Sequence, residues 1–471
     1  MSTAPVAPPE PGSQPPPEKT PSFGSGARVL SVGIASTGIF TFAYLATSSH
    51  VLSRRDYGLI SLCWAIMFVI LSVIYRPIEQ LLSRTIADRR ARGLHGHPLR
   101  VPASIQLGFA ALFVAVAVLE RHAIRYGMFG GSAALYWILV VGVIAYAGSY
   151  FARGWLAGHQ YFALYGGLVF LESTSRFLFP LAVAIGIGSG LGTVGLGMAV
   201  APFASLSVMP FAIARIRRAL PSATSDIPVV DAAAEGPAHA QLEQASADLS
   251  LRHGTGFAVS VVGIMLSEQA LMNAGVLIVA ARAGAHDLNS GLTGFVFNVM
   301  LIVRAPLQLF QAIQTSILPH LAGLQARESA AEFRRAIRTT VLVIAGFGLA
   351  VALGLLAIGP PVMALLLGDK GFDYGRVGLA LVGLGMGLHL VCGTLNQAAL
   401  ARGRAPAAAA AWLLAATLFV AFQIAGVIAS EVTRVEVGYF GATAVLCAML
   451  VGVYRRGGAT APAVAAASGP A

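Results

Sequence analysis

The sequence predicts an all-α polytopic membrane protein, with about 12 transmembrane helices in two pseudo-repeated six-helix lobes around a central cavity. Its 471 residues are 56% hydrophobic and only 11% charged, whereas soluble domains carry about 25% charged residues. Apolar segments of about 20 residues recur along the chain, which is the length that crosses a hydrocarbon core of about 30 Å. A charged, proline-containing motif also recurs about half a chain later, which indicates a duplicated unit.

Twelve apolar segments are expected to cross the bilayer. We place them at 29–50, 58–82, 101–119, 132–152, 163–187, 191–213, 255–280, 292–318, 339–358, 377–400, 406–429 and 437–454. Residues 29–218 then form an N-terminal lobe and 254–456 a C-terminal lobe. The segment 219–253 has three prolines, five acids and little apolar content, which predicts a flexible cytoplasmic linker. The proline-rich tail 1–28 and the alanine-rich tail 457–471 are expected to be disordered.

The distribution of basic residues predicts the orientation. With both termini in the cytoplasm, the inner loops and tails hold 20 of the 31 lysines and arginines, the outer loops hold 8 and the spans hold 3. Cytoplasmic loops of membrane proteins are enriched in Lys and Arg, so we expect a multi-pass protein with both termini inside. The arginine-rich segment 325–338 is expected to form a helix along the inner surface, where it either meets anionic lipid or anchors the next span.

The repeated motif places one arginine in each half. Residues 74–82 read Ile-Tyr-Arg-Pro-Ile-Glu-Gln-Leu-Leu, and residues 302–310 read Ile-Val-Arg-Ala-Pro-Leu-Gln-Leu-Phe. Arg76 therefore corresponds to Arg304, and each arginine is followed four residues later by a glutamine, Gln308 in the second copy. Two tripeptides with the sequence Val-Gly-Ile, separated by nearly the same offset, support the duplication.

Six charged residues fall inside the predicted spans. Each costs about 2.5–3.5 kcal/mol at a helix centre, so six unpaired charges in lipid would cost more than the about 5–15 kcal/mol that stabilises a typical domain. They must therefore face one another or a water-filled cavity. These candidate functional residues are Arg76, Glu79, Glu172, Arg176, Glu268 and Arg304.

Each of the six charges has a structural alternative, which is weakest for Arg304 and Glu268 because they lie nearer the middle of their spans. Arg76 lies near the inner end of its span, so it either faces the cavity or extends to the interface, with Glu79 one turn away as a partner. Glu172 and Arg176 are four residues apart with the acid first, the favourable order for an ion pair on a helix. They form either a self-neutralising structural pair or part of a ligand site.

The sequence contains no arrangement typical of a catalytic or metal site. Cys63, Cys392 and Cys447 all lie within apolar segments, where cysteine is expected to pack as a small apolar residue. His95 and His97 have no further ligands at metal-like spacing. The net charge of +11 is not gathered on a soluble module, so a nucleic acid is not an expected partner. We expect no enzyme activity, no cofactor and no metal.

Several short motifs are similar to those of a known transporter family. They are Arg55-Asp56-Tyr57-Gly58 after the first span, Arg153-Gly154-x-x-x-Gly158-x-x-x-Phe162-x-x-Tyr165 followed by Glu172-x-x-x-Arg176, and Gly359-Pro360-Pro361 through Leu367-Gly368 just outside the ninth span. In these motifs the chain resembles the polysaccharide-type (Wzx-like) flippases of the multidrug/oligosaccharidyl-lipid/polysaccharide (MOP) exporter superfamily. The resemblance covers about residues 30–450. Tyr161 departs from it, because many relatives carry a basic residue there.

The resemblance implies that the protein moves an undecaprenyl-pyrophosphate-linked glycan across the bacterial inner membrane by alternating access. Its expected partners are this lipid-linked glycan with its pyrophosphate polyprenyl carrier, the membrane lipids, and a coupling cation or proton. The candidate substrate-binding residues are Arg76, Arg304, Arg176, Glu172 and Gln308, and the candidate coupling residues are Glu268 and Glu79.

Two other functions stay open from the sequence. A drug or metabolite cation antiporter of the same superfamily usually couples through an aspartate in the first span, and the first span here has no acid. A membrane-embedded glycan polymerase or glycosyltransferase is expected to gather acids at one edge of the bilayer. The aspartates of the predicted outer loops are instead scattered along the chain, at Asp56, Asp287, Asp369 and Asp373.

Overall fold

The described part of the chain is almost entirely helical. The computed structural model describes residues 23–91, 99–219, 259–283, 291–304, 306–307, 330–368 and 371–456. Within these ranges the backbone forms helices, turns and short connections, and no β-strand.

The N-terminal lobe is built from six spans. Its elements are α1 (Phe23–Val51), α2 (Arg54–Ile70), the π-helix η1 (Leu71–Tyr75), α3 (Arg76–Ala91), α4 (Arg100–Leu119), the π-helix η2 (Ala123–Met128), α5 (Ala133–Gly158), α6 (Phe162–Ala184), α7 (Gly190–Leu206) and α8 (Val208–Ala219). The helices α2, η1 and α3 continue into one another as one span, and α7 and α8 do the same.

The C-terminal lobe also supplies six spans. They are the helices Val259–Ala283 and Leu292–Arg304, then α11 (Ala330–Leu367), α12 (Arg376–Ala401), α13 (Ala405–Ala425) and α14 (Glu431–Arg456). Ten helices in the described residues are long and apolar enough to cross a membrane. The 29-residue helix α1 and the shorter apolar helix Leu292–Arg304 occupy the other two predicted spans. The predicted fold class is confirmed, with about 12 transmembrane helices in two six-helix lobes.

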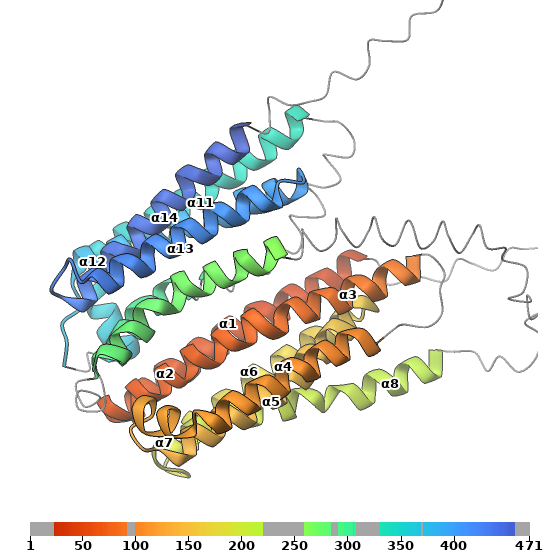
Figure 1. Cartoon of the computed structure of the whole chain (residues 1–471), viewed down its shortest axis with the longest axis horizontal. Helices are drawn as coiled ribbons and strands as arrows, with labels where there is room; N and C mark the ends of the chain where they lie inside the picture. Colours follow the sequence, from red (N-terminus) through yellow and green to blue (C-terminus); the bar gives the residue numbers. More distant parts are fainter. Residues whose placement is uncertain are drawn as a thin grey trace, which may run out of the picture.

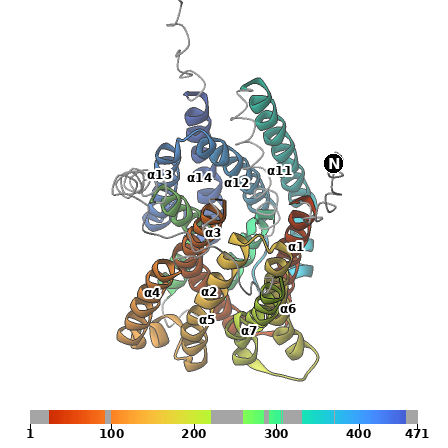
Figure 2. The same ribbon diagram turned by 90° about the vertical axis from the view of Figure 1, so that its right-hand side faces the viewer.

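The two lobes lie side by side and meet most closely at one end. Figure 1 shows α11–α14 above α1–α8, with the two groups converging toward the end where α1 turns into α2. Figure 2, turned by 90°, also separates α11–α14 from the helices of the N-terminal lobe. Because successive spans alternate in direction, this end also carries the turns between α6 and α7 and between α13 and α14.

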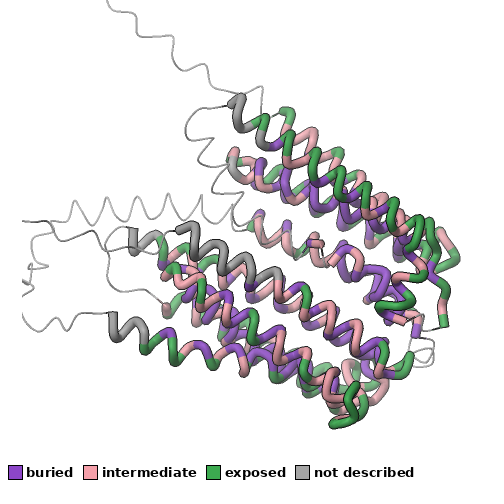
Figure 3. The backbone as a smooth tube through the Cα atoms, turned by 180° about the vertical axis from the view of Figure 1, so that it is seen from behind, coloured by how far each residue is buried: buried purple, intermediate pink, exposed green. Residues whose placement is uncertain are grey.

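The outer faces of the bundle are apolar. Exposed residues gather along the outside, whereas buried residues lie between the helices (Figure 3). Exposed large side chains on α4 and α11 include Leu107, Leu112, Leu119, Phe347, Leu353 and Leu365. Such continuous apolar stripes would be unfavourable in water but are the expected surface toward lipid tails.

Several predicted boundaries need correction. The predicted surface helix 325–338 is not separate in its described part, because residues 330–338 are the first turns of α11. The same 38-residue helix continues to Leu367, so the Gly-Pro-Pro segment 359–361 lies inside the ninth span rather than just outside it. Membrane helices accommodate proline because neighbouring helices and local adjustments satisfy the freed carbonyls.

The termini and the linker are only partly described. Helix α1 begins at Phe23, so the predicted disordered tail 1–28 includes its first residues. Residues 1–22, 220–253 and 457–471 of the predicted tails and linker lie outside the described residues.

Glycines let α11 and α12 approach closely. A Cβ added to Gly348 on α11 would lie 2.5 Å from the Cα of Gly387 on α12, and a Cβ on Gly387 would lie 2.8 Å from the Cα of Gly348. Real Cβ atoms do not tolerate such distances to a backbone, so the contact requires glycine on both helices.

The variant Gly348→Val is therefore expected to push the two helices apart. Overpacking typically costs about 1–3 kcal/mol, and the thermal unfolding midpoint of the detergent-purified protein should fall. Gly354→Val is the matched control, because Gly354 is on the same helix and a Cβ there meets nothing within 4 Å. Equal unfolding midpoints for the two variants would contradict this packing.

Candidate functional site

A cavity of about 370 Å³ lies between the lobes. It is lined by α1, α2, η1, α3, α5 and α6 of the N-terminal lobe and by the helices Val259–Ala283 and Leu292–Arg304, together with Leu307, of the C-terminal lobe. The charged residues that line it are Arg76, Glu79, Arg153, Glu172, Arg176, Glu268 and Arg304. All six charges that the sequence placed within spans therefore face one space. Gln308, the remaining candidate, lies outside the described residues.

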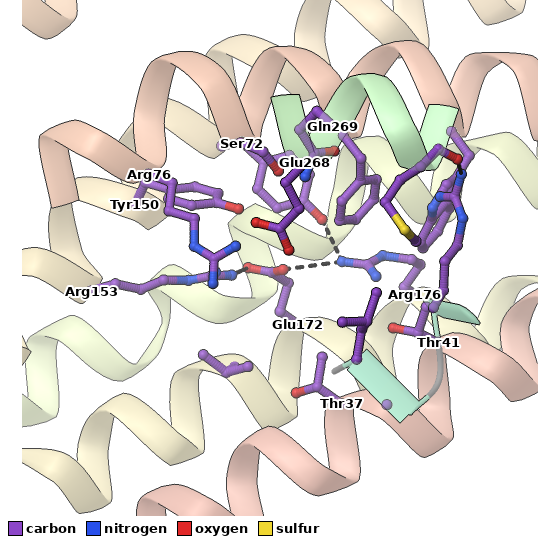
Figure 4. Close-up of a pocket in the computed structure, with 18 of the residues that line it drawn as sticks. Thr37, Thr41, Ser72, Arg76, Tyr150, Arg153, Glu172, Arg176, Glu268 and Gln269 are labelled. Atoms are coloured by element: carbon purple, nitrogen blue, oxygen red, sulfur yellow. Dashed lines mark hydrogen bonds and ion pairs between the residues drawn. The ribbon is translucent and has the colours of Figure 1, made fainter. Parts of the chain in front are cut away.

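Glu172 accepts more hydrogen bonds than the other glutamates of the cavity. One carboxylate oxygen accepts hydrogen bonds from the Arg153 guanidinium and, at 3.0 Å, from the hydroxyl of Ser149. The other oxygen accepts from the Arg176 guanidinium at 3.0 Å. Glu172 is 4% exposed and Arg176 is 2% exposed. Figure 4 shows the carboxylate of Glu172 lying between the two arginines. The predicted Glu172–Arg176 pair is present and belongs to a larger cluster.

Aromatic side chains hold Arg176 in place. Its guanidinium carbon lies 5.0 Å from the ring centre of Trp64 and 5.8 Å from that of Phe68. The guanidinium also donates a hydrogen bond to the hydroxyl of Tyr146. A cation over an aromatic face gains about 2 kcal/mol or more when it is desolvated. Arg176 is therefore a rigid part of the cavity wall.

Arg153 was not among the sequence candidates. Sequence reasoning ended the fourth span at residue 152, whereas α5 continues to Gly158 and keeps Arg153 inside the helix. The guanidinium carbon of Arg153 lies 4.5 Å from the ring centre of Tyr150. The sequence signal that could have identified Arg153 is the Arg153-Gly154-x-x-x-Gly158 motif. Its glycines let α5 pack against the backbone around Glu79, because a Cβ on Gly154 would lie 2.8 Å from the Glu79 carbonyl oxygen.

Glu79 is bonded to a tyrosine. The hydroxyl of Tyr165, on α6, donates a hydrogen bond of 2.7 Å to the carboxylate of Glu79. The expected Arg76–Glu79 ion pair does not occur among the ion pairs of the described residues. Arg76 lines the cavity, which is the first of the two alternatives for its side chain.

A π-helical turn precedes Arg76. In η1 the hydrogen bonds span five residues instead of four, and the N–H of Arg76 donates to the carbonyl of Leu71, five residues back. Pro77 follows and has no N–H to donate. π-Helical turns inserted in α-helices are frequent at functional sites. The insertion rotates α3 relative to α2 and thereby sets the direction in which Arg76 leaves the helix.

The C-terminal lobe contributes Arg304 and Glu268. Arg304 donates hydrogen bonds to the side-chain oxygen of Asn273 at 2.7 Å and to the carbonyl of Met272 at 3.1 Å, and it lies 4.5 Å from the ring centre of Phe297. Within the described residues, no acid pairs with it. The carboxylate of Glu268 points across the cavity toward Arg76 and Glu172 (Figure 4).

Solved structures share this architecture. A MATE transporter of Vibrio cholerae aligns over 93% of this chain and 98% of its own, with 13% identity and a TM-score of 0.58. Two structures described as the inward-facing and outward-facing conformations of a multidrug resistance MATE family transporter of the MOP superfamily give TM-scores of 0.59 and 0.60. Their identities are 13% and 16%, over 92% and 93% of this chain and 94% and 96% of theirs. The chain has the MATE fold. No protein-family model and no curated protein sequence matches it.

On this MATE fold the cavity carries an excess of arginine. Four arginines face three glutamates, and Glu172 is already shared by two of the arginines. Arg76 and Arg304, one from each lobe, are left without an ion pair among the described residues. Guanidinium groups in such a position favour an anion with several oxygen atoms. The described residues hold no group of three or more metal-ligating side chains.

Replacing Glu172 by glutamine should strongly destabilise the protein. The change leaves Arg153 and Arg176 as buried cations without a counter-charge, and breaking a buried pair typically costs about 3–5 kcal/mol. Glu268→Gln is the matched comparison, because Glu268 lines the same cavity and makes no ion pair among the described residues. Thermal unfolding of the two purified variants measures the difference. If Glu268→Gln lowers the midpoint as much as Glu172→Gln, the central role of Glu172 is wrong.

Proposed function

We propose that this protein is a transporter that carries a lipid-linked oligosaccharide or polysaccharide precursor across the bacterial inner membrane by alternating access. The observation that carries the proposal is the pair Arg76 and Arg304, which line one cavity from opposite lobes without an ion pair among the described residues. The cargo would be bound by the pyrophosphate that joins its glycan to the polyprenyl carrier.

The chemistry of the cargo fits this charge pattern. A pyrophosphate cannot cross about 30 Å of hydrocarbon without compensation for its lost hydration. Arginine stays protonated when buried and can bind two phosphate oxygens at once. Arg76 and Arg304 would provide this compensation from both sides. Glu172, through its ion pairs with Arg153 and Arg176, would hold both arginines in the cavity wall and reduce the net positive charge of the cavity.

The drug-antiporter alternative has less support from this cavity. A cationic drug would be repelled by a cavity in which four arginines face three glutamates. Helix α1 lines the cavity with Thr37, Gly38, Thr41, Phe42 and Leu45, and its sequence contains no acid. The antiporter interpretation therefore lacks the first-span aspartate through which such transporters usually couple.

The proposed orientation places both termini in the cytoplasm. It rests on the excess of Lys and Arg in the loops that would then face inward. In that orientation, the end of the molecule at which the lobes converge faces the outside, and the cavity would take up its cargo from the inner side.

Removal of either Arg76 or Arg304 should slow transport. Arg76→Ala and Arg304→Ala are each expected to reduce the rate at which vesicles containing the protein move a pyrophosphate-linked lipid glycan by at least about tenfold, because a hydrogen bond to a charged group is worth about 1.5–3 kcal/mol. Arg76→Lys and Arg304→Lys should retain part of the rate, since lysine keeps the charge but cannot bind two oxygens at once.

Arg282→Ala is the control for these variants. Arg282 lies outside the cavity, donates to the carbonyl of Ile424 and lies 3.8 Å from Glu431. It should transport at the parental rate. If both cavity variants also transport at the parental rate, the two arginines are not the anion ligands.

Glu268 is the proposed coupling group, with Glu79 as the second candidate. A carboxylate that faces the cavity and has no cation paired to it among the described residues can bind a proton or a cation there. Glu268→Gln should therefore abolish the dependence of transport on the ion gradient while the protein still folds. Rates measured with and without a proton or sodium gradient test this, with Glu431→Gln as a control outside the cavity. A gradient dependence equal to that of the parent protein would make Glu268 a structural residue.

A further inference from the structure

The lobes touch through a row of polar contacts at the end where they converge. The hydroxyl of Tyr57, on α2, donates a hydrogen bond to the side-chain oxygen of Asn298 in the C-terminal lobe. The side-chain nitrogen of Asn298 donates to the hydroxyl of Tyr374 at 3.3 Å, and that hydroxyl donates to the carbonyl of Gly368 at 2.9 Å. Tyr57 and Asn298 are both 0% exposed. A hydrogen-bonded chain whose three side chains are buried thus connects the lobes.

Neighbouring contacts extend this seam. The hydroxyl of Ser49, at the end of α1, donates to the carbonyl of Leu367 at the end of α11. The backbones also approach closely, because a Cβ on Gly294 would lie 3.3 Å from the Cα of Gly58 and 2.8 Å from the ring of Tyr57. The absence of a side chain at Gly294 is therefore what lets Tyr57 reach Asn298.

A polar seam is suited to repeated opening. When two hydrogen-bonded groups separate into water, each finds a new partner, so the net cost of one bond is small. An apolar seam would instead cost about 25 cal/mol for every square ångström that it exposes. The polar groups of this seam are not required by contact with solvent, since Tyr57 and Asn298 are both fully buried. Between membrane helices such groups hold the contact through hydrogen bonds instead of through the burial of apolar surface.

We propose that the Tyr57–Asn298–Tyr374 chain is a latch that closes this end of the cavity and breaks when the cavity opens there. The proposal rests on the proposed transport function, because only a transporter needs the lobes to part at this end. Loss of the latch weakens the closed state relative to the open one. One such hydrogen bond corresponds to a shift of about 2- to 12-fold in the ratio of the two states.

Cysteine labelling of a buried seam position measures the open population directly. Ser61 lies one turn after Tyr57 on α2 and is 0% exposed. A Ser61→Cys protein is labelled by a hydrophilic maleimide only when the seam opens, and while reclosing is faster than labelling, the rate is proportional to the open population. The parent protein, with its buried Cys63 and Cys392 and half-buried Cys447, gives the background.

Three variants in the Ser61→Cys protein test the latch. Asn298→Ala, in the opposite lobe, and Tyr57→Phe should each raise the labelling rate at least about 2-fold. Tyr136→Phe is the control, since it removes a buried hydroxyl that bonds to the carbonyl of Ala117 within the N-terminal lobe, and its rate should not change. The latch is refuted if Asn298→Ala and Tyr57→Phe both label at the rate of the control.

The labelling experiment separates the latch from the cargo. It requires no substrate, so faster labelling in a protein that does not move lipid-linked glycan would support the latch and reject the proposed cargo. Normal glycan transport with unchanged labelling would reject the latch and leave the transport function standing. Thermal unfolding midpoints within the range of Tyr136→Phe confirm that the labelling reports on the seam and not on global unfolding.

Discussion

The cost of placing charge inside a hydrocarbon layer is the constraint on which this structure depends. Seven charged side chains lie at the centre of a molecule whose outer face is apolar, and each would be unfavourable in contact with lipid. The fold resolves this by closing two bundles around a polar cavity. Glu172 has a central place in this arrangement, because its two ion pairs offset the charges of Arg153 and Arg176 and fix both side chains within the N-terminal lobe.

The two lobes use this cavity differently. The N-terminal lobe supplies a compact cluster in which Glu172 is bonded on both oxygens and Glu79 is bonded to Tyr165. The C-terminal lobe supplies two charges on neighbouring helices that do not pair with each other, Glu268 and Arg304. In the proposed function, the rigid wall of the N-terminal lobe and the charges of the C-terminal lobe would together bind an anion at the lobe interface and release it when the lobes move.

Charge and hydropathy in the sequence were sufficient to predict the fold class and six of the seven cavity charges. The reason is that a charge within an apolar span is costly in lipid and therefore faces the interior of the bundle or a water-filled cavity. Arg153 was not predicted because the ends of helices are difficult to locate from sequence. The predicted end of the fourth span was residue 152, which left Arg153 in the following loop. The ninth span was drawn too short for the related reason that two adjacent prolines usually indicate a helix end. The partners of each charge depend on tertiary packing, so neither the Glu79–Tyr165 bond nor the Arg304–Asn273 bond could be read from spacing along the chain.

The central claim is that the cavity recognises a pyrophosphate carried on a polyprenyl chain. Binding of a short-chain polyprenyl pyrophosphate to the purified protein, compared with binding of the corresponding neutral alcohol, tests it most directly. We expect the pyrophosphate to bind at least about tenfold more tightly than the alcohol, since charge-assisted hydrogen bonds contribute about 1.5–3 kcal/mol each, and we expect added salt to weaken its binding. Equal affinities for the pyrophosphate and the alcohol would contradict the account.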